Sequence, residues 1–441
     1  MLSVSILTFD LSDNATGRAD LLARLLAPRY RVHVVGPRFG RSLWGPARAT
    51  GVEHREVEGV RYPRFAGRLG AIAGLADGDI LYASKPRATS FGVGLLARAR
   101  RRRPLVLDID DWELGFFLRS GMWGTAGRAL NLTNPNGLPW TWLMERLIHR
   151  ADALTVGSRF LAHRFGGTLL PHVRDTEAWD PARFDREAAR AALGAGDRRV
   201  VMFLGTPRGH KGVDELVAAV SLLADDVMLA IVGADLSSEA ARRWSAMPHV
   251  RVFGEVAFDE APQWLIGADV VAVPQRDTPD TVGQVPAKLF DAMALARPVV
   301  STRVSMIPEI LDGCGVLVPP GDVGALAAAL RRVLDDPSEA AALGRHGRAR
   351  CEAHYSFRAA RARLFPLFEQ VASCADGERG SRDAAARANR GAGPRDAARN
   401  EDGRLGGRDV GRHADGGLGG RDVGRHADGG FGGRPEPPNF R

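Results

Sequence analysis

Two successive series of short apolar runs, alternating with stretches of helical spacing, constrain the fold of this chain most strongly. In the first series, strands are predicted at Val4–Phe9, Arg31–Val35, Asp79–Tyr82, Pro104–Ile109 and Ala153–Val156. In the second, they are predicted at Arg199–Leu204, Val227–Val232, Val250–Phe253, Val270–Val273 and Pro298–Ser301. Such alternation is typical of parallel sheets that helices cover on both faces. The sequence therefore predicts an α/β protein with two doubly wound, Rossmann-like domains.

Changes in composition along the chain predict the domain boundaries. Residues 1–180 form the first domain and residues 190–355 the second, with a turn-rich connection between them. An amphipathic helix at 356–374 follows. From 375 to 441 the chain is rich in Gly, Arg, Asp and Ala, and a repeated LGGRDVGRHADGG segment fills 405–430. Because such a tail cannot bury enough apolar surface to offset the entropy of ordering, we predict that it is disordered.

Residues 112–145 interrupt the alternation in the first domain. They hold Trp112, Trp123, Trp140 and Trp142 among Gly, Asn and Pro. One interpretation is an insertion that packs as a lid. The other is a surface for a lipid-linked or membrane-embedded acceptor, because aromatic side chains favour the membrane interface.

The charge of the chain indicates which partners it binds, and its cysteine content indicates its cellular compartment. The formal net charge of +8 is spread along the chain without a nucleic-acid-binding motif, so we predict anionic substrates or lipid headgroups and no nucleic acid. Cys314, Cys351 and Cys374 are odd in number and widely spaced, which favours free thiols. The sequence has no signal-peptide pattern and no long apolar run. These features predict a cytoplasmic protein, with peripheral contact at the inner face of the membrane as a further expectation.

Only three lysines, Lys85, Lys211 and Lys288, occur among 60 basic residues. A lysine that persists among so many arginines indicates a place where a compact ammonium is needed. Lys211 lies in the Gly-rich Gly205–Gly212, after a predicted strand, with Arg208 nearby; Lys288 begins a predicted helix. Backbone amides, a helix N-terminus and two cations suit a diphosphate. Chance survival is the alternative, and it is strongest for Lys85.

The remaining candidates follow from the rule that open α/β sheets bind ligands outside the carboxyl ends of their strands. Asp291 lies one helical turn after Lys288 and is placed to accept hydrogen bonds from ribose hydroxyls, or to form a salt bridge with Lys288. Asp110 and Asp111 follow a predicted strand and are candidates to orient an acceptor hydroxyl or take its proton, with a helix cap or an arginine salt bridge as the alternative. His172 is a catalytic or a structural histidine.

The segment from Val200 to Phe357 resembles the donor-binding half of family 4 glycosyltransferases, which have the GT-B fold. The motifs that carry the resemblance are FLGTPRGHKGVDEL at 203–216, VRVFGEV at 250–256, ADVVAVP at 268–274 and PAKLFDAMALARPVV at 286–300. NATG at 14–17 and DALTVGS at 152–158 resemble the acceptor domain more weakly. The resemblance implies two Rossmann-like domains that face each other across a cleft.

The resemblance also implies a reaction: retaining transfer of a sugar from a UDP- or GDP-linked donor to an envelope, polysaccharide or small-molecule acceptor. Arg208 and Lys211 would neutralise the leaving diphosphate. Because these cations take the place of a metal ion, we expect no obligatory metal and no other cofactor. A nucleotide-sugar epimerase or hydrolase of the same fold and a non-catalytic nucleotide-sugar binder are the alternatives.

By the same resemblance, further residues take positions around the donor. Asp291 would stand at the ribose, Gly254 to Val256 would border the base, and Gly17 would line the phosphates from the first domain. Gly283 stands where the family has its first glutamate. Recognition of the sugar hydroxyls would therefore use backbone amides around Thr281, Val282 and Gly283, or a neighbour such as Asp280 or Gln284, and Lys288 would contact the phosphates.

Overall fold

The computed structural model describes residues 1–48, 50–118, 128, 130–279 and 281–391, without the side chains of 118 and 375–391. Residues 1–384 form one compact unit. Trp123 and the repeated segment at 405–430 lie outside the described residues, as does most of the predicted disordered tail.

The first series of strands forms a seven-stranded sheet in the order β3-β2-β1-β4-β5-β6-β7, and every pair is parallel. The strands are β1 Ser3–Leu7, β2 Arg31–Arg38, β3 Glu53–Glu58, β4 Ile80–Ser84, β5 Leu105–Ile109, β6 Ala153–Val156 and β7 Thr168–Leu169. The centre of the sheet is buried: Val4 of β1 pairs with Val32 on one side and Ile80 on the other. The predicted parallel sheet is confirmed.

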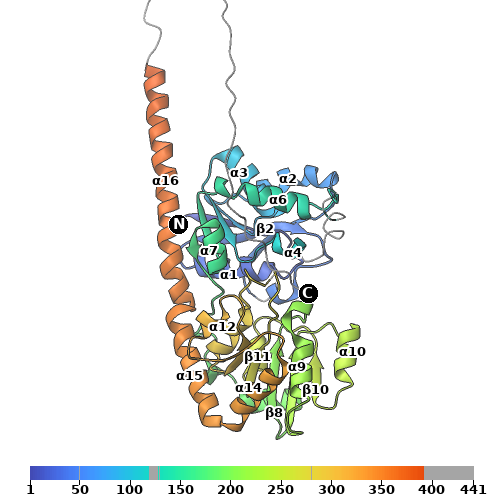
Figure 1. Cartoon of the computed structure of the whole chain (residues 1–441). Helices are drawn as coiled ribbons and strands as arrows, with labels where there is room; N and C mark the ends of the chain where they lie inside the picture. The colour runs from blue at the N-terminus through green and yellow to red at the C-terminus, as the bar shows by residue number, and fades with distance from the viewer. Residues whose placement is uncertain (49, 119–127, 129, 280, 392–441) are drawn as a thin grey trace, which may run out of the picture. The chain divides into compact units, whose positions relative to one another are not determined.

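Helices cover this sheet, as Figure 1 shows around β2. They are α1 Thr16–Leu26, α2 Arg64–Leu75, α3 Val93–Arg101, α4 Gly115–Leu118, α6 Leu138–Arg146 and α7 Arg159–Phe165. Short 3₁₀ turns lie at η1 Gly45–Ala47 and η3 Ile148–Arg150, and a π-helical turn, η2, spans Ala88–Gly92.

The second series forms a six-stranded parallel sheet in the order β10-β9-β8-β11-β12-β13. Its strands are β8 Arg199–Leu204, β9 Val227–Val232, β10 Val250–Phe253, β11 Val270–Val273, β12 Val299–Thr302 and β13 Val316–Val318. Its helices are α8 Arg186–Leu193, α9 Val213–Val220, α10 Glu239–Ser245, α11 Ala261–Leu265, α12 Ala287–Ala294, α13 Ile307–Leu311, α14 Val323–Asp335 and α15 Pro337–His354, with 3₁₀ turns η4 Pro181–Arg183 and η5 Gly209–Lys211.

The chain returns from the second sheet to the first beside the place where it left. Arg174 accepts a backbone hydrogen bond from Phe357 and donates one to Tyr355, each at 2.9 Å. Helix α16 then runs from Phe357 to Gly391 (Figure 1). Its Phe368 packs against Tyr82 of β4 and against Tyr30, which directly precedes β2, with ring centroids 5.2 and 5.7 Å apart.

The predicted end of the last helix at residue 374 is wrong, because α16 continues to Gly391. The added stretch contains Ala384, Ala385 and Ala386 and several arginines, which are strong helix formers. The loss of apolar residues after residue 374 suggested that the helix ends there, but the helix propensity of these residues extends it.

The aromatic insertion divides between packed and exposed side chains. Trp140 stacks on Tyr62 at 4.8 Å and its Nε1 donates to the carbonyl of Leu132, while Trp112 packs on Phe160 at 5.6 Å. Trp142 is 48% exposed, and the guanidinium of Arg146 lies 4.3 Å from its ring centroid. Among the described residues, no helix is long and apolar enough to span a membrane.

Candidate active site

A cavity of about 920 Å³ lies between the carboxyl ends of the two sheets, within the unit of residues 1–384. Ten predicted residues line it: Gly17, Asp110, Asp111 and His172 from the first half, and Gly205, Arg208, Lys211, Val256, Lys288 and Asp291 from the second. The predicted residues of both halves therefore lie at one site, as expected for side chains at the carboxyl ends of parallel strands.

The loop after β8 is shaped by two glycines in the left-handed region. Gly205 has φ +109° and Gly212 has φ +65°. A Cβ on Gly212 would lie 1.9 Å from the carbonyl oxygen of Pro274, so only glycine fits there. This turn carries Arg208 and Lys211 to the cavity before α9 begins at Val213. Lys211 Nζ donates to the Thr206 carbonyl at 3.0 Å.

Lys288, at the start of α12, brings a third cation to the same wall. Its Nζ lies 3.8 Å from the ring centroid of Phe203 and has no hydrogen-bond acceptor in the part of the chain that the structure describes. Burial, together with the neighbouring Lys211, holds the pKa of Lys288 well below its usual value. Burial and Arg208 lower the pKa of Lys211 to about 8. An anion beside these groups would offset the cost of charging both, so this wall fits a diphosphate.

The ion pair that the structure gives Asp291 is with Arg174 and not with Lys288. Arg174 Nε donates to Asp291 Oδ1, and both side chains are buried at the cavity. The salt bridge between Lys288 and Asp291, which was the alternative to the ribose role, is therefore not formed. Asp291 still faces the cavity, and its place at the ribose stays a prediction.

Four predicted donor residues do not line the cavity in the described structure: Gly254, Thr281, Val282 and Gly283. Thr281 closes its own turn, because its amide donates to the Thr278 carbonyl and its hydroxyl to the carbonyl of Arg276. Val282 is partly exposed, and its carbonyl accepts from Ser305. The Cβ position of Gly283 faces Phe160 and Trp112, both at 3.2 Å, and that of Gly254 faces Leu236. Their chain neighbours Glu255 and Gln284 line the cavity instead.

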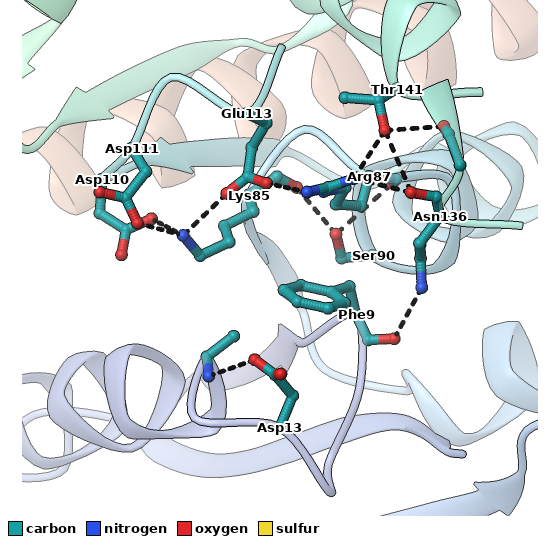
Figure 2. A network of polar contacts seen from close by, with 12 residues as sticks. Phe9, Asp13, Lys85, Arg87, Ser90, Asp110, Asp111, Glu113, Asn136 and Thr141 are labelled. Carbon is teal, nitrogen blue, oxygen red and sulfur yellow. Dashed lines mark hydrogen bonds and ion pairs between the residues drawn. The ribbon is translucent and has the colours of Figure 1, made fainter. Parts of the chain in front are cut away.

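Three carboxylates surround Lys85 on the opposite wall (Figure 2). Its Nζ lies 2.9 Å from Asp110 Oδ1, 2.8 Å from Asp111 Oδ2 and 2.8 Å from Glu113 Oε1. Arg87 forms an ion pair with the second oxygen of Glu113 and donates to Thr141 Oγ1 at 2.8 Å. The arginine salt bridge that was one alternative for Asp110 and Asp111 is thus a lysine salt bridge in the structure.

Burial and neighbouring charges together lower the pKa of Asp110 and raise that of Asp111. Burial raises the pKa of Asp110, but Lys85 and Arg18 outweigh it and bring the value to about 2. Burial and the neighbouring acids raise the pKa of Asp111 above its usual value in spite of Lys85. Of the three acids, Asp111 is thus the one best suited to accept a proton from a ligand.

His172 is neutral at physiological pH. Burial and the guanidinium of Arg18 lower its pKa to about 3. Arg18 itself forms a bidentate pair with Asp108, both contacts at 2.8 Å, and donates to the Leu170 and Pro171 carbonyls just before His172. The ring of His172 therefore lines the cavity as a neutral group.

Several cavity residues were missed by sequence reasoning. Arg18, Arg174 and Glu113 line the site without having been predicted, as does Gln275, which was only part of a longer polar stretch at a predicted strand end. Gln275 is buried, and its Nε2 has no hydrogen-bond partner among the described residues. Lys85 carried a signal in its rarity, whereas the arginines could not be told from the many others in the chain.

Two parallel sheets with a cavity between their carboxyl ends, cations on one wall and carboxylates on the other, give the chain the architecture of the GT-B fold. A sequence profile described as glycosyl transferases group 1 matches residues 198–336. A GDP-mannose-dependent alpha-(1-6)-phosphatidylinositol monomannoside mannosyltransferase of Mycolicibacterium smegmatis is 31% identical over 337 residues, which cover 72% of this chain and 83% of that protein. The chain belongs to the group 1 glycosyltransferases and is an enzyme of that family.

Two further comparisons agree. A GDP-mannose-dependent monoacylated alpha-(1-6)-phosphatidylinositol monomannoside mannosyltransferase of Corynebacterium glutamicum is 28% identical over 270 residues, covering 55% of this chain and 70% of the relative. The Anabaena protein Alr3699/HepE in complex with UDP and glucose superposes with a TM-score of 0.66 at 18% identity, covering 84% of this chain and all of that one. The second likeness shows the fold alone.

Proposed function

We propose that this enzyme transfers mannose from GDP-mannose, with retention of configuration, to a lipid-linked acceptor of the phosphatidylinositol mannoside type. The two relatives above use GDP-mannose and an acceptor of this type according to their names. The observation that carries a diphosphate-linked donor is the ammonium of Lys288, buried at the cavity without an acceptor in the described chain.

In this proposal the donor's diphosphate lies against Arg208, Lys211 and Lys288. The bond between C1 of the sugar and the diphosphate oxygen breaks, and a bond from C1 to the acceptor oxygen forms. Negative charge grows on the diphosphate as it leaves, and the three cations stabilise that charge. Asp111 orients the acceptor hydroxyl and takes its proton, and neutral His172 adds a hydrogen bond at the same wall.

The reaction needs no metal ion in this scheme. The donor wall has its own cations, and on the acceptor wall Lys85 Nζ stands at the centre of the carboxylates that would otherwise hold a divalent ion. Both positions where a cation would serve are therefore filled by lysine or arginine side chains.

A lipid-linked acceptor requires contact with a membrane surface. Leu130, Leu132, Trp142 and Leu143 are exposed on the first domain, in the aromatic insertion and α6. Exposed Trp and Leu beside arginine side chains are typical of surfaces that lie in a headgroup layer. We propose that this surface brings the enzyme to the membrane as a peripheral protein.

The proposal is tested with purified protein, GDP-mannose and phosphatidylinositol monomannoside in mixed micelles. We expect a mannosylated lipid and release of GDP, and NMR of the product should show the α-anomer, since the donor is α-linked. UDP-glucose serves as the competing donor, and Lys211→Ala as the control variant. Turnover with UDP-glucose alone would overturn the donor assignment, and GDP release without lipid product would overturn the acceptor.

A further inference from the structure

We propose that Lys85 is a positioning residue that acts as a resident cation: it holds Asp110, Asp111 and Glu113 in one cluster so that Asp111 alone is presented to the acceptor. The inference deepens the proposed function and rests on it for the role of Asp111. It starts from the geometry in Figure 2, where one ammonium lies among three carboxylates.

The number of contacts suits an ammonium, and the contact with Asp111 is a hydrogen bond. Lys85 Nζ has three N–H donors and three carboxylate oxygens at 2.8 to 2.9 Å. Those oxygens belong to residues whose ligand atoms lie within 4.8 Å of one another, which is the spacing of a metal site. A planar guanidinium cannot point donors to three oxygens around one centre. This explains why lysine was kept here in a chain that otherwise uses arginine.

The backbone is set to deliver this ammonium. Lys85 has φ +70°, a left-handed conformation that a residue with a side chain rarely adopts. Its amide donates to the Asp108 carbonyl at 2.8 Å and its carbonyl accepts from Ser90 Oγ at 2.7 Å. Both bonds fix the end of β4 beside the end of β5, where the acids begin. Glycine would adopt this backbone conformation without strain, so the lysine is not explained by the needs of the backbone.

The cluster leaves one carboxylate in surplus, and the structure shows where that charge is exposed. Three acids face two cations, Lys85 and Arg87. The side chains of Asp110 and Glu113 are 5% and 3% exposed, whereas that of Asp111 is 19% exposed at the cavity. Without the ammonium, mutual repulsion would drive the acids apart, and Asp111 would lose its fixed orientation.

The first experiment is manganese binding to Lys85→Ala in the full chain without nucleotide. Removal of the ammonium leaves the three acids free to bind Mn²⁺, so we expect one bound ion by calorimetry and by electron paramagnetic resonance. The wild type should bind none at this cluster. Lys288→Ala is the matched control, because it also removes a buried cavity lysine but one without carboxylate partners at hydrogen-bond distance. A folded Lys85→Ala that binds no Mn²⁺ would overturn the inference.

The second readout is mannosyl transfer from GDP-mannose to phosphatidylinositol monomannoside. Lys85→Ala should lose about 100-fold in kcat through misplacement of Asp111, while the dissociation constant for GDP stays unchanged. Added Mn²⁺ should restore part of the activity of this variant and leave the wild type unaffected. Full activity of Lys85→Ala without metal would contradict a positioning role. Lost activity that Mn²⁺ does not restore would indicate a merely structural residue and would also overturn the inference.

Two outcomes remain to be assigned. If Lys85→Ala does not fold, it is refolded with and without Mn²⁺: recovery of GDP-binding protein only with Mn²⁺ supports the inference, and no recovery in either condition overturns it. Asp111→Asn separates this inference from the proposed function. If Asp111→Asn stays active while Lys85→Ala binds Mn²⁺, the role of Asp111 is wrong and the cation role of Lys85 stands.

Discussion

Arg174 and Asp291 form a buried ion pair between the segment that enters the second domain and helix α12, with the guanidinium Nε donating to the carboxylate Oδ1. The backbone of Arg174 is hydrogen-bonded to Tyr355 and Phe357, at the point where the chain returns. The residue predicted to meet the ribose is thus also the partner that keeps a buried arginine neutralised at the junction of the two domains.

Asp291→Ala should therefore destabilise the fold as well as weaken donor binding. Loss of the carboxylate leaves the Arg174 guanidinium buried without its partner, and we expect the free energy of unfolding to fall by about 3–5 kcal/mol. Urea unfolding followed by circular dichroism measures this change. The double variant Arg174→Met, Asp291→Leu removes both charges and should recover much of the loss. A single variant as stable as the wild type would show that the pair is not desolvated in solution.

Nucleotide affinity should fall as the pH rises above about 8. The pKa of Lys211 is lowered to about 8 and that of Lys288 also lies below its usual value, yet a bound diphosphate needs both ammonium groups. Binding must then raise these pKa values, so affinity is complete below the free-enzyme pKa and is lost above it, by up to about tenfold per pH unit for each lysine.

Calorimetry of GDP binding at pH 8.5 in two buffers of different ionisation heat tests this directly. We expect net proton uptake by the wild type and less uptake by Lys211→Ala. Binding without proton uptake and with a constant affinity between pH 7.5 and 9.5 would mean that the diphosphate does not lie against these lysines.

Removal of His172 should leave the pH profile of the reaction unchanged between pH 5 and 9. Burial and Arg18 lower its pKa to about 3, so the ring is neutral across that range. His172→Gln keeps a hydrogen-bonding group and should reduce kcat without moving either limb of the profile. Loss of a limb in this variant would assign the titration to His172 and contradict the neutral ring.

Chelators should not inhibit the wild-type enzyme. Because Lys85 fills the carboxylate cluster, and Lys211 and Lys288 are proposed to bind the diphosphate, we expect transfer rates in EDTA equal to those in buffer with Mg²⁺. The assay is mannosyl transfer after exhaustive dialysis against the chelator. A rate that falls in EDTA and returns with one divalent ion would show that a metal takes part.

The fold was predictable because apolar runs mark most central strands, and these runs matched β1, β2, β4, β5, β6 and β8 to β12 within a few residues. The strand β3 was missed because its sequence, EHREVE, has only one apolar residue. It lies at the edge of the sheet and pairs only with β2, so its side chains need not be apolar. The short strands β7 and β13 were missed as well.

The site was predictable only in part, because strand ends and rare lysines are local signals while ion pairs are not. Arg18 reaches Asp108 across 90 positions, and Arg174 reaches Asp291 across 117. Only tertiary structure shows such partners. Thr281 was predicted to line the donor site but does not line the cavity, for another reason. Its hydroxyl donates to carbonyls within its own turn, which a sequence motif does not reveal.

The adjacent crossings at Arg174 and Ser356, joined as an isolated parallel bridge, make the donor half a cassette. Residues 175–355 begin and end at this one place. Helix α16 follows them in the chain and packs on the first domain through Phe368. A donor half from another family member can accordingly be exchanged through two junctions without cutting either sheet. Under the proposed function, such an exchange would change the donor and leave the rest of the chain, including the last helix, intact.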